Sequence, residues 1–295
     1  MRLVRSIPEL RVLLKTLKGR GDRIGFVPTM GYLHAGHEAL IKHCRSRCDS
    51  IVVSVFINPL QFGPEEDFHR YPHDLDRDQA MCLDQDVTIL FMPEPKELYS
   101  TGFSTFIDPG PMGQVLCGKY RPGHFRGVTT VVAKLLNTIQ PDLAFFGQKD
   151  LQQSAIIRRM VWDLNIPVEL VVTPTVRESD GLAMSSRNSY LSDEERGRAL
   201  CISKALHAAG SAYQSGLRSA SELIDIARQN LYELDELQYC ELVDALTLDP
   251  IEGQIGRLAG LCVAGKLGNT RLIDNILLSE SEDPTRLLSL VGIPE

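Results

Sequence analysis

Short, nearly continuous apolar runs alternate with amphipathic segments through the first 175 residues of the chain. Residues 50 to 56 read SIVVSVF, and residues 87 to 92 read VTILFM. Such β-branched runs are typical of parallel strands that helices cover on both faces. Helical periodicity marks other segments, notably residues 74 to 85 and 128 to 139. Strands thus alternate with helices, and the pattern predicts an α/β fold with a Rossmann-like parallel sheet.

The polar pattern changes after Pro174. Residues 176 to 190 are polar and rich in turn formers, and the remainder favours two long helices and two or three short strands. The expected helices span residues 192 to about 213 and 221 to 234, and the expected strands lie near 238–243, 260–266 and 270–276. This predicts an N-terminal domain over residues 1–175 and a smaller α+β domain over residues 176–295. The last dozen residues are expected to form a loose tail.

Composition narrows the class of protein without naming a function. Hydrophobic residues make up 43% and charged residues 23% of the chain, which is ordinary for a globular protein. The net charge of −7 argues against nucleic acid or an anionic membrane as a partner. No leader segment and no membrane-length apolar run is found, and the cysteines are scattered, so we expect a cytoplasmic protein. Cys44 and Cys48 are expected to be packed thiols rather than a metal pair.

A turn between an expected strand and an expected helix concentrates candidate chemistry. Residues 27 to 37 read VPTMGYLHAGH, with His34 and His37 three apart. The free N–H groups and the dipole of a helix N-terminus favour anionic phosphate there, and histidines at i and i+3 share one helix face. Alternatively, the histidines only cap and pack. Zinc binding is a weaker option, because no HExxH pattern or cysteine cluster supplies further ligands.

Other polar turns are expected at the same edge of the sheet. The NPLQF loop after residue 57 and the turn Gly147 to Asp150 both follow expected strands, and the carboxyl ends of parallel strands meet at one edge. Lys149 there could be a solvated charge or a phosphate ligand. The run Ser185 to Asn188 offers hydroxyls and a guanidinium suited to a phosphate chain, although it is also a common loop composition. The convergence of these turns predicts a nucleotide site.

Neutral amides and carboxylates add two further expectations. Gln61 and Gln153 could each bind a hydroxyl or carboxylate oxygen of a substrate. Asp74, Asp76 and Asp78 most simply form a solvated helix face, with Mg²⁺ binding as the alternative.

Six segments of the chain occur in the order and spacing found in one enzyme family. They are PTMGYLHAGH, FINPLQF, RPGHFRGVTTVV, FFGQKDLQQ, PTVRESDGLAMSSRN and LGNTRLIDNI. From about residue 5 to about residue 278 the chain therefore resembles the pantothenate synthetase (pantoate–β-alanine ligase) family. The HxGH turn is also similar to that of nucleotidylyltransferases and class I aminoacyl-tRNA synthetases. In that wider group a Lys-Met-Ser-type loop is the partner, and AMSSRN stands in its place here.

The resemblance implies a two-step reaction. ATP and pantoate would form pantoyl adenylate and pyrophosphate, and the amine of β-alanine would then attack the acyl carbon to give pantothenate and AMP. Mg²⁺ would accompany ATP, and no metal site built from the protein's own residues is expected. The family also suggests a homodimer. The first domain would bind ATP and pantoate, and the second would act as a lid that carries the MSSRN loop.

The resemblance also implies residue roles. His37, as the general acid, His34 and Lys149 would be catalytic. ATP-binding residues would be Met30, Gly31, Tyr32, Leu33, His34, Ala35, Gly36, His37, Gly147, Gln148, Lys149, Asp150, Val176, Met184, Ser185, Ser186 and Arg187. Residues for pantoate or β-alanine would be Gln61, Gln153, Asn58 and Arg121.

Three positions depart from the family pattern. Tyr32 replaces a small residue, Ala35 a frequent glutamate, and Gln148 a common glutamate. The histidines, glycines, Lys149 and paired serines are intact, so we expect an active enzyme. Two other hypotheses stay open from the sequence: a nucleotidylyltransferase for another small acid or phosphate, and a nucleotide-binding module without catalysis.

Overall fold

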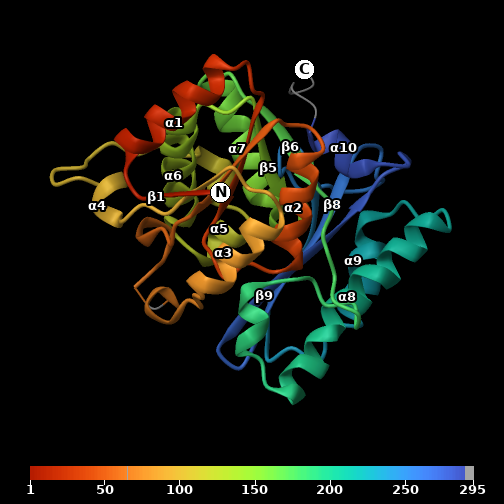
Figure 1. Ribbon diagram of the computed structural model, residues 1–295. Helices are drawn as coiled ribbons and strands as arrows, with labels where there is room; N and C mark the ends of the chain where they lie inside the picture. Colours follow the sequence, from red (N-terminus) through yellow and green to blue (C-terminus); the bar gives the residue numbers. More distant parts are fainter. Residues whose placement is uncertain (65, 290–295) are drawn as a thin grey trace.

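The computed structural model describes residues 1–64 and 66–289 and contains two sheets (Figure 1). The first has six parallel strands in the order β1-β4-β3-β2-β5-β6. These are β1 (Arg2–Val4), β2 (Ile24–Thr29), β3 (Ser50–Val55), β4 (Ile89–Phe91), β5 (Leu143–Gly147) and β6 (Glu169–Thr173). The predicted Rossmann-like sheet is confirmed, and its strands point their carboxyl ends to one edge.

Helices cover both faces of this sheet. One core packs α1 (Ile7–Gly19), α6 (His124–Ile139) and α7 (Leu151–Asp163) against the sheet, and the other packs α2 (Ala35–Arg45) and α3 (Leu75–Asp84). Alternate residues of a strand enter opposite cores: Phe26 joins the first and Val27 the second, and both are fully buried. This two-sided burial explains why the strands read as continuous apolar runs.

Two features of the first sheet were not predicted. The edge strand β1 has only three residues, too few for a periodic signal, and pairs with β4. The long loop after β4 carries two short helices, α4 (Pro95–Leu98) and α5 (Cys117–Tyr120).

Cys44 and Cys48 pack against Gly25, where any larger side chain would collide with both sulfur atoms.

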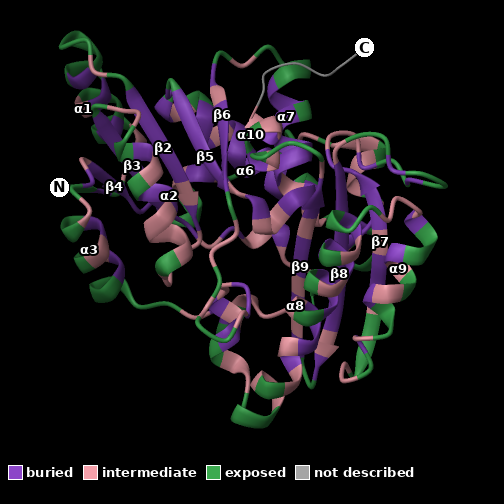
Figure 2. Cartoon of the chain, turned by 90° about the vertical axis from the view of Figure 1, so that its right-hand side faces the viewer, coloured by how far each residue is buried: buried purple, intermediate pink, exposed green. Residues whose placement is uncertain are grey.

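The second sheet has three antiparallel strands, β7 (Glu236–Asp244), β8 (Ala259–Leu267) and β9 (Thr270–Leu278), and lies beside the first (Figure 2). Helices α8 (Asp193–Gln214) and α9 (Ala220–Arg228) pack on it around a core of their own. The smaller α+β part is thus confirmed. We propose a domain boundary near residue 175, just after β6 ends.

The expectation of a loose C-terminal tail is wrong for its first half. Residues Pro284–Ser289 form helix α10, which returns to β6. Pro284 suits the first turn of a helix, and Thr285 and Leu288, three apart on one face, are buried. The backbone N–H of Val172 in β6 donates to Ser289 Oγ over 2.8 Å. The end of the expected tail, residues 290–295, lies outside the described residues.

In the described part of the chain, no helix combines the length and the apolar character that crossing a membrane requires.

Candidate active site

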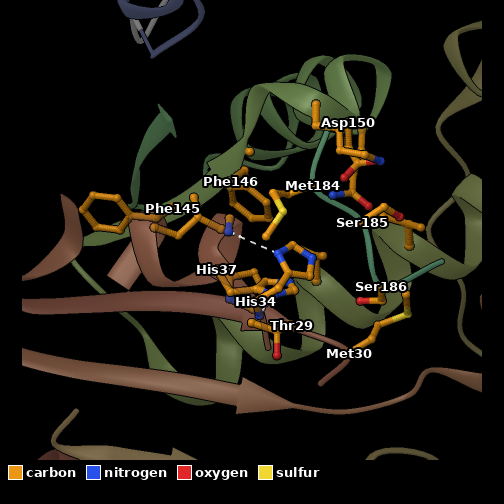
Figure 3. Close-up of a pocket in the computed structure, with 18 of the residues that line it drawn as sticks. Thr29, Met30, His34, His37, Phe145, Phe146, Asp150, Met184, Ser185 and Ser186 are labelled. Atoms are coloured by element: carbon orange, nitrogen blue, oxygen red, sulfur yellow. Dashed lines mark hydrogen bonds between the residues drawn. The ribbon is translucent and has the colours of Figure 1, made fainter. Parts of the chain in front are cut away.

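A cavity of about 240 Å³ opens at the carboxyl edge of the parallel sheet, where β2, β5 and β6 end. Figure 3 shows the rings of His34 and His37 on one side, with Met184 and Ser185 across from them. Most of the predicted site residues line this cavity. They are Met30, His34, Gly36, His37, Asn58, Gln61, Arg121, Gly147, Lys149, Asp150, Gln153, Val176, Met184, Ser185, Ser186 and Arg187. Five predicted ATP ligands do not line it: Gly31, Tyr32, Leu33, Ala35 and Gln148.

The two histidines cap the N-terminus of α2 and thereby fix their own tautomers. The backbone N–H of Gly36 donates to His34 Nδ1 over 3.1 Å, and the backbone N–H of His34 donates to His37 Nδ1 over 3.3 Å. Because each Nδ1 is an acceptor, a neutral ring must carry its proton on Nε2. Capping and ligand binding, posed as alternatives by the sequence, are therefore compatible: one ring nitrogen caps, and the other remains as a donor.

Both rings are held neutral. Burial, together with the positive charges of Lys149 and Arg77, lowers the pKa of His34 from 6.5 to about 4. Burial, His34 and Lys149 lower the pKa of His37 well below its ordinary value. The ring centroids lie only 4.1 Å apart, which would make two positive charges costly. In this site Lys149 supplies the cationic charge and the histidines supply neutral N–H donors.

A buried carboxylate shapes the turn before the histidines. Gly31 and Tyr32 both have left-handed backbone conformations, with φ of 88° and 53°. The backbone N–H groups of Tyr32 and Leu33 both donate to the carboxylate of Asp78 in α3, over 2.9 and 2.6 Å. Asp78 is only 1% exposed, so it does not belong to the solvated helix face that the sequence predicted. The N–H groups of this turn are therefore occupied by the protein's own anion and are closed to a phosphate.

The position of Tyr32 is also explained by this turn. Its ring lies beside the guanidinium of Arg77, whose carbon is 5.3 Å from the ring centroid. Left-handed backbone is unfavourable for a bulky residue, and the two hydrogen bonds to Asp78 hold it there. Leu33 is fully buried in the core that packs α2 and α3 against the sheet, and it anchors the same turn.

Two neighbouring amides, Asn58 and Gln61, also line the cavity. Asn58 Nδ2 donates to Gln61 Oε1 and to the carbonyl of Gly127, both over 3.1 Å. Asn58 is 1% exposed, and its amide is committed to protein groups. Gln61 Nε2 lies 2.9 Å from Met30 Sδ. Of these two predicted substrate ligands, Gln61 faces the cavity as a hydrogen-bond donor, while Asn58 holds it in place.

One wall of the cavity is apolar. It consists of Phe56 after β3 and four residues on the same face of α6: Val128, Val131, Val132 and Leu135. Gln153, from α7, adds a polar group to the lining. A small acid with an aliphatic body fits such a mixture of donors and apolar surface.

Each of the two arginines at the site has a carboxylate partner that the sequence did not reveal. Arg121 forms a two-pronged ion pair with Glu66, with separations of 2.8 and 2.6 Å. Arg187 forms another with Asp67, with both separations 2.9 Å. The ionic and hydrogen-bond contacts of these arginines keep the pKa values of Glu66 and Asp67 below their usual range despite partial burial.

The second sheet fixes the turn that carries Lys149. Asn275 of β9 donates its amide N–H groups to the carbonyls of Gln148 and Lys149, over 3.0 and 2.8 Å. The side chain of Gln148 points toward this contact: its Nε2 donates to Asn275 Oδ1 over 3.4 Å, and its Oε1 accepts from the Thr285 hydroxyl of α10 over 2.7 Å. Gln148 is buried and its side chain serves to join the two sheets.

Several residues of the site were missed in the sequence. His124 lines the cavity between Arg121 and Gln61: its Nδ1 donates to the Gln61 carbonyl over 2.8 Å, and Arg121 donates to its Nε2 over 3.0 Å. Tyr71 also lines it. For Asp78 a signal existed, because it shares a helix face with the buried Cys82 four residues later. For Tyr71 and His124, which lie in or beside irregular segments, no periodicity offered a guide.

Comparisons with known proteins agree on one family. Residues 2–277 match the family model described as Pantoate-beta-alanine ligase. The chain is 55% identical over 281 residues to Pantothenate synthetase 1 of Bradyrhizobium diazoefficiens, which covers 95% of this chain and 99% of that protein.

Solved structures give the same result. A pantothenate synthetase from Thermus thermophilus superposes with a TM-score of 0.88 at 46% identity, covering 94% of this chain and 99% of that one. A pantoate-beta-alanine ligase from Francisella tularensis, described as complexed with beta-gamma ATP and beta-alanine, superposes with a TM-score of 0.78 at 34% identity. It covers 94% of this chain and 97% of that one.

Proposed function

Since the chain belongs to the pantoate–β-alanine ligase family, we propose that the cavity described above activates pantoate with ATP and joins it to β-alanine. The chain is accordingly an ATP-dependent ligase that forms pantothenate. The observation that supports placing the reaction in this cavity is its combination of groups. Two neutral histidine donors and Lys149 face an apolar wall and the donor amide of Gln61.

In the first step, a carboxylate oxygen of pantoate attacks the α-phosphorus of ATP, and the bond to pyrophosphate breaks. Negative charge then grows on the phosphate oxygens. His34 and His37 stabilise it by donating from Nε2, and Lys149 by its charge. The resemblance suggested His37 as a general acid. The low pKa of His37 favours hydrogen-bond donation instead, because a neutral imidazole is a weak acid.

In the second step, the amine of β-alanine attacks the acyl carbon of pantoyl adenylate, and AMP leaves. Pantoate carries a carboxylate and two hydroxyls, and two methyl groups share one of its carbons. We propose that Gln61 and Gln153 bind its oxygens and that the α6 wall of Val128, Val131 and Val132 packs against its methyl groups. The cavity would thereby recognise both halves of the acid.

The nucleotide would occupy the rest of the lining. We propose that Met184, Ser185, Ser186 and Arg187 contact its phosphates opposite the histidines, in the manner implied by the AMSSRN resemblance. Gly31, Tyr32, Leu33, Ala35 and Gln148 lie outside this lining, so we assign them to support of the turns. Mg²⁺ would arrive as the ATP complex, with the carboxylate of Asp150 at the cavity as its candidate protein ligand. We also propose a cytoplasmic homodimer, which sedimentation would test.

The test is a reaction of the purified protein with MgATP, pantoate and β-alanine. We expect AMP and pantothenate in equal amounts, and pyrophosphate without pantothenate when β-alanine is left out of a single-turnover reaction. Pyrophosphate release with another acid but not with pantoate would support the nucleotidylyltransferase hypothesis. ATP binding without turnover of any acid, while a curated relative is active in the same assay, would overturn the proposal in favour of a non-catalytic module.

A further inference from the structure

We propose that Tyr99 is a positioning residue for pantoate: through Asn58 it fixes the amide of Gln61 so that only N–H donors face the cavity. The inference rests on the proposed function and adds to it a residue that does not line the cavity. It also assigns Gln61 a definite polarity toward the substrate.

The orientation of the Asn58 amide is set by the backbone. Its Oδ1 accepts the N–H of Leu60 over 3.3 Å, and its Nδ2 donates to the carbonyl of Gly127 over 3.1 Å. A backbone N–H can only donate and a carbonyl can only accept, so a flipped amide would lose both contacts. Asn58 therefore presents an N–H to Gln61.

Tyr99 adds the remaining contact to this amide. Its hydroxyl donates to Asn58 Oδ1 over 2.8 Å. Burial raises the pKa of Tyr99, so the hydroxyl keeps its proton. The ring is held between aromatic neighbours, with centroids 6.1 Å from Phe56 and 4.9 Å from Phe103. The ring thus packs against one residue of the apolar cavity wall, Phe56, and against Phe103, which does not line the cavity.

The orientation of the Asn58 amide in turn orients the amide of Gln61. Its Oε1 accepts from Asn58 Nδ2 over 3.1 Å, so the Nε2 group is turned toward Met30 and the cavity. Gln61 can then bind an acceptor on the substrate, such as a carboxylate or hydroxyl oxygen, and offers no acceptor in return. Removing the Tyr99 hydroxyl leaves the Asn58 oxygen with one partner, the N–H of Leu60, and so weakens an amide orientation that the two backbone contacts still favour.

The test compares Tyr99→Phe with Tyr232→Phe, a control at a side chain that is 79% exposed. We expect Tyr99→Phe to raise KM for pantoate about three- to tenfold, on the scale of one hydrogen bond. KM for ATP should stay within about twofold. A purely structural role would not separate the two substrates.

A second variant tests the polarity. Gln61→Glu keeps an oxygen toward Asn58 but replaces the donor with a negatively charged acceptor, so it should weaken pantoate binding more than Gln61→Ala does. An active wild-type enzyme whose KM for pantoate is unchanged by Tyr99→Phe, or changes in step with KM for ATP, overturns the positioning role. Equal pantoate binding by Gln61→Glu and wild type overturns the polarity. A wild-type protein without turnover overturns the proposed function, and the inference falls with it.

Discussion

Each histidine of the HAGH turn, residues 34–37, uses both of its ring nitrogens. Nδ1 of His34 and of His37 accepts a backbone N–H, and Nε2 is left to donate into the cavity. The sequence identifies the histidines, but it cannot give their tautomers, because these depend on which backbone N–H groups the helix start leaves free. A mutation at either residue therefore removes a cap together with the proposed phosphate donor.

We predict that His37→Ala and Lys149→Ala each slow adenylation by about 10²-fold, the scale of a lost donor or charge at a developing oxyanion. Single-turnover formation of pantoyl adenylate measures this step directly. If either variant forms the adenylate at a near-normal rate, that residue has no part in the mechanism.

The low pKa of His34 also predicts how stability depends on pH. The unfolded chain takes up this proton near pH 6.5 and the folded chain near pH 4, so between these values the unfolded state binds more protons. Acidification through this window must therefore destabilise the fold. Between about pH 7.5 and about pH 5.5, the titration of His34 lowers the free energy of unfolding by on the order of 1 kcal/mol.

His34→Asn tests this contribution, because asparagine can still cap α2 but does not titrate. Urea unfolding at both pH values should show a smaller loss on acidification than in wild type. His207→Gln, at an exposed position of α8, is the control and should behave like wild type. An equal pH dependence in His34→Asn and wild type would contradict the assigned pKa.

Among the elements, α3 contributes to the site through a single side chain. Asp78 accepts two hydrogen bonds from the turn that precedes α2, although α3 otherwise packs against a face of the sheet. Asp78→Asn replaces one acceptor oxygen with an N–H₂ group facing an N–H donor. We predict a loss of about 2 kcal/mol in the free energy of unfolding and roughly tenfold slower adenylation.

The matched control is Asp76→Asn, at an exposed position of the same helix. Denaturant unfolding and single-turnover assays should leave this control close to wild type. Loss of stability in Asp78→Asn with a normal adenylation rate would limit Asp78 to a structural role.

The elements themselves were largely predictable from the sequence. Buried strands such as β3 are almost continuously apolar, and helices such as α8 open with a capping box that the structure confirms at Ser192 and Glu195. What sequence patterns miss are elements without a period of their own, such as β1, and polar groups inside apolar faces, such as Asp78. The partners of Arg121 and Arg187 were hidden for another reason: they lie 55 and 120 residues away in the chain.

At the scale of the whole molecule, the two sheets meet at the turn that carries Lys149, the lysine proposed to be catalytic. Asn275 of β9 supports the turn of Lys149 with two hydrogen bonds. We predict that Asn275→Ala leaves these carbonyls unpaired, costs about 2–4 kcal/mol in the free energy of unfolding, and raises KM for ATP severalfold. Asn137→Ala, exposed on α6, is the control. Weaker ATP binding in both variants, or in neither, would contradict a specific link from β9 to the site.

The return of α10 to β6 ties the two parts of the molecule together a second time. The chain leaves the first sheet after Thr173 and comes back at Pro284. Residues of β7 and β8, among them Tyr239, Val243 and Cys262, also belong to the hydrophobic core that packs α7 against the first sheet. The α+β part is therefore joined to the parallel sheet by a shared core as well as by two crossings of the chain, so neither part can unfold without exposing apolar surface of the other.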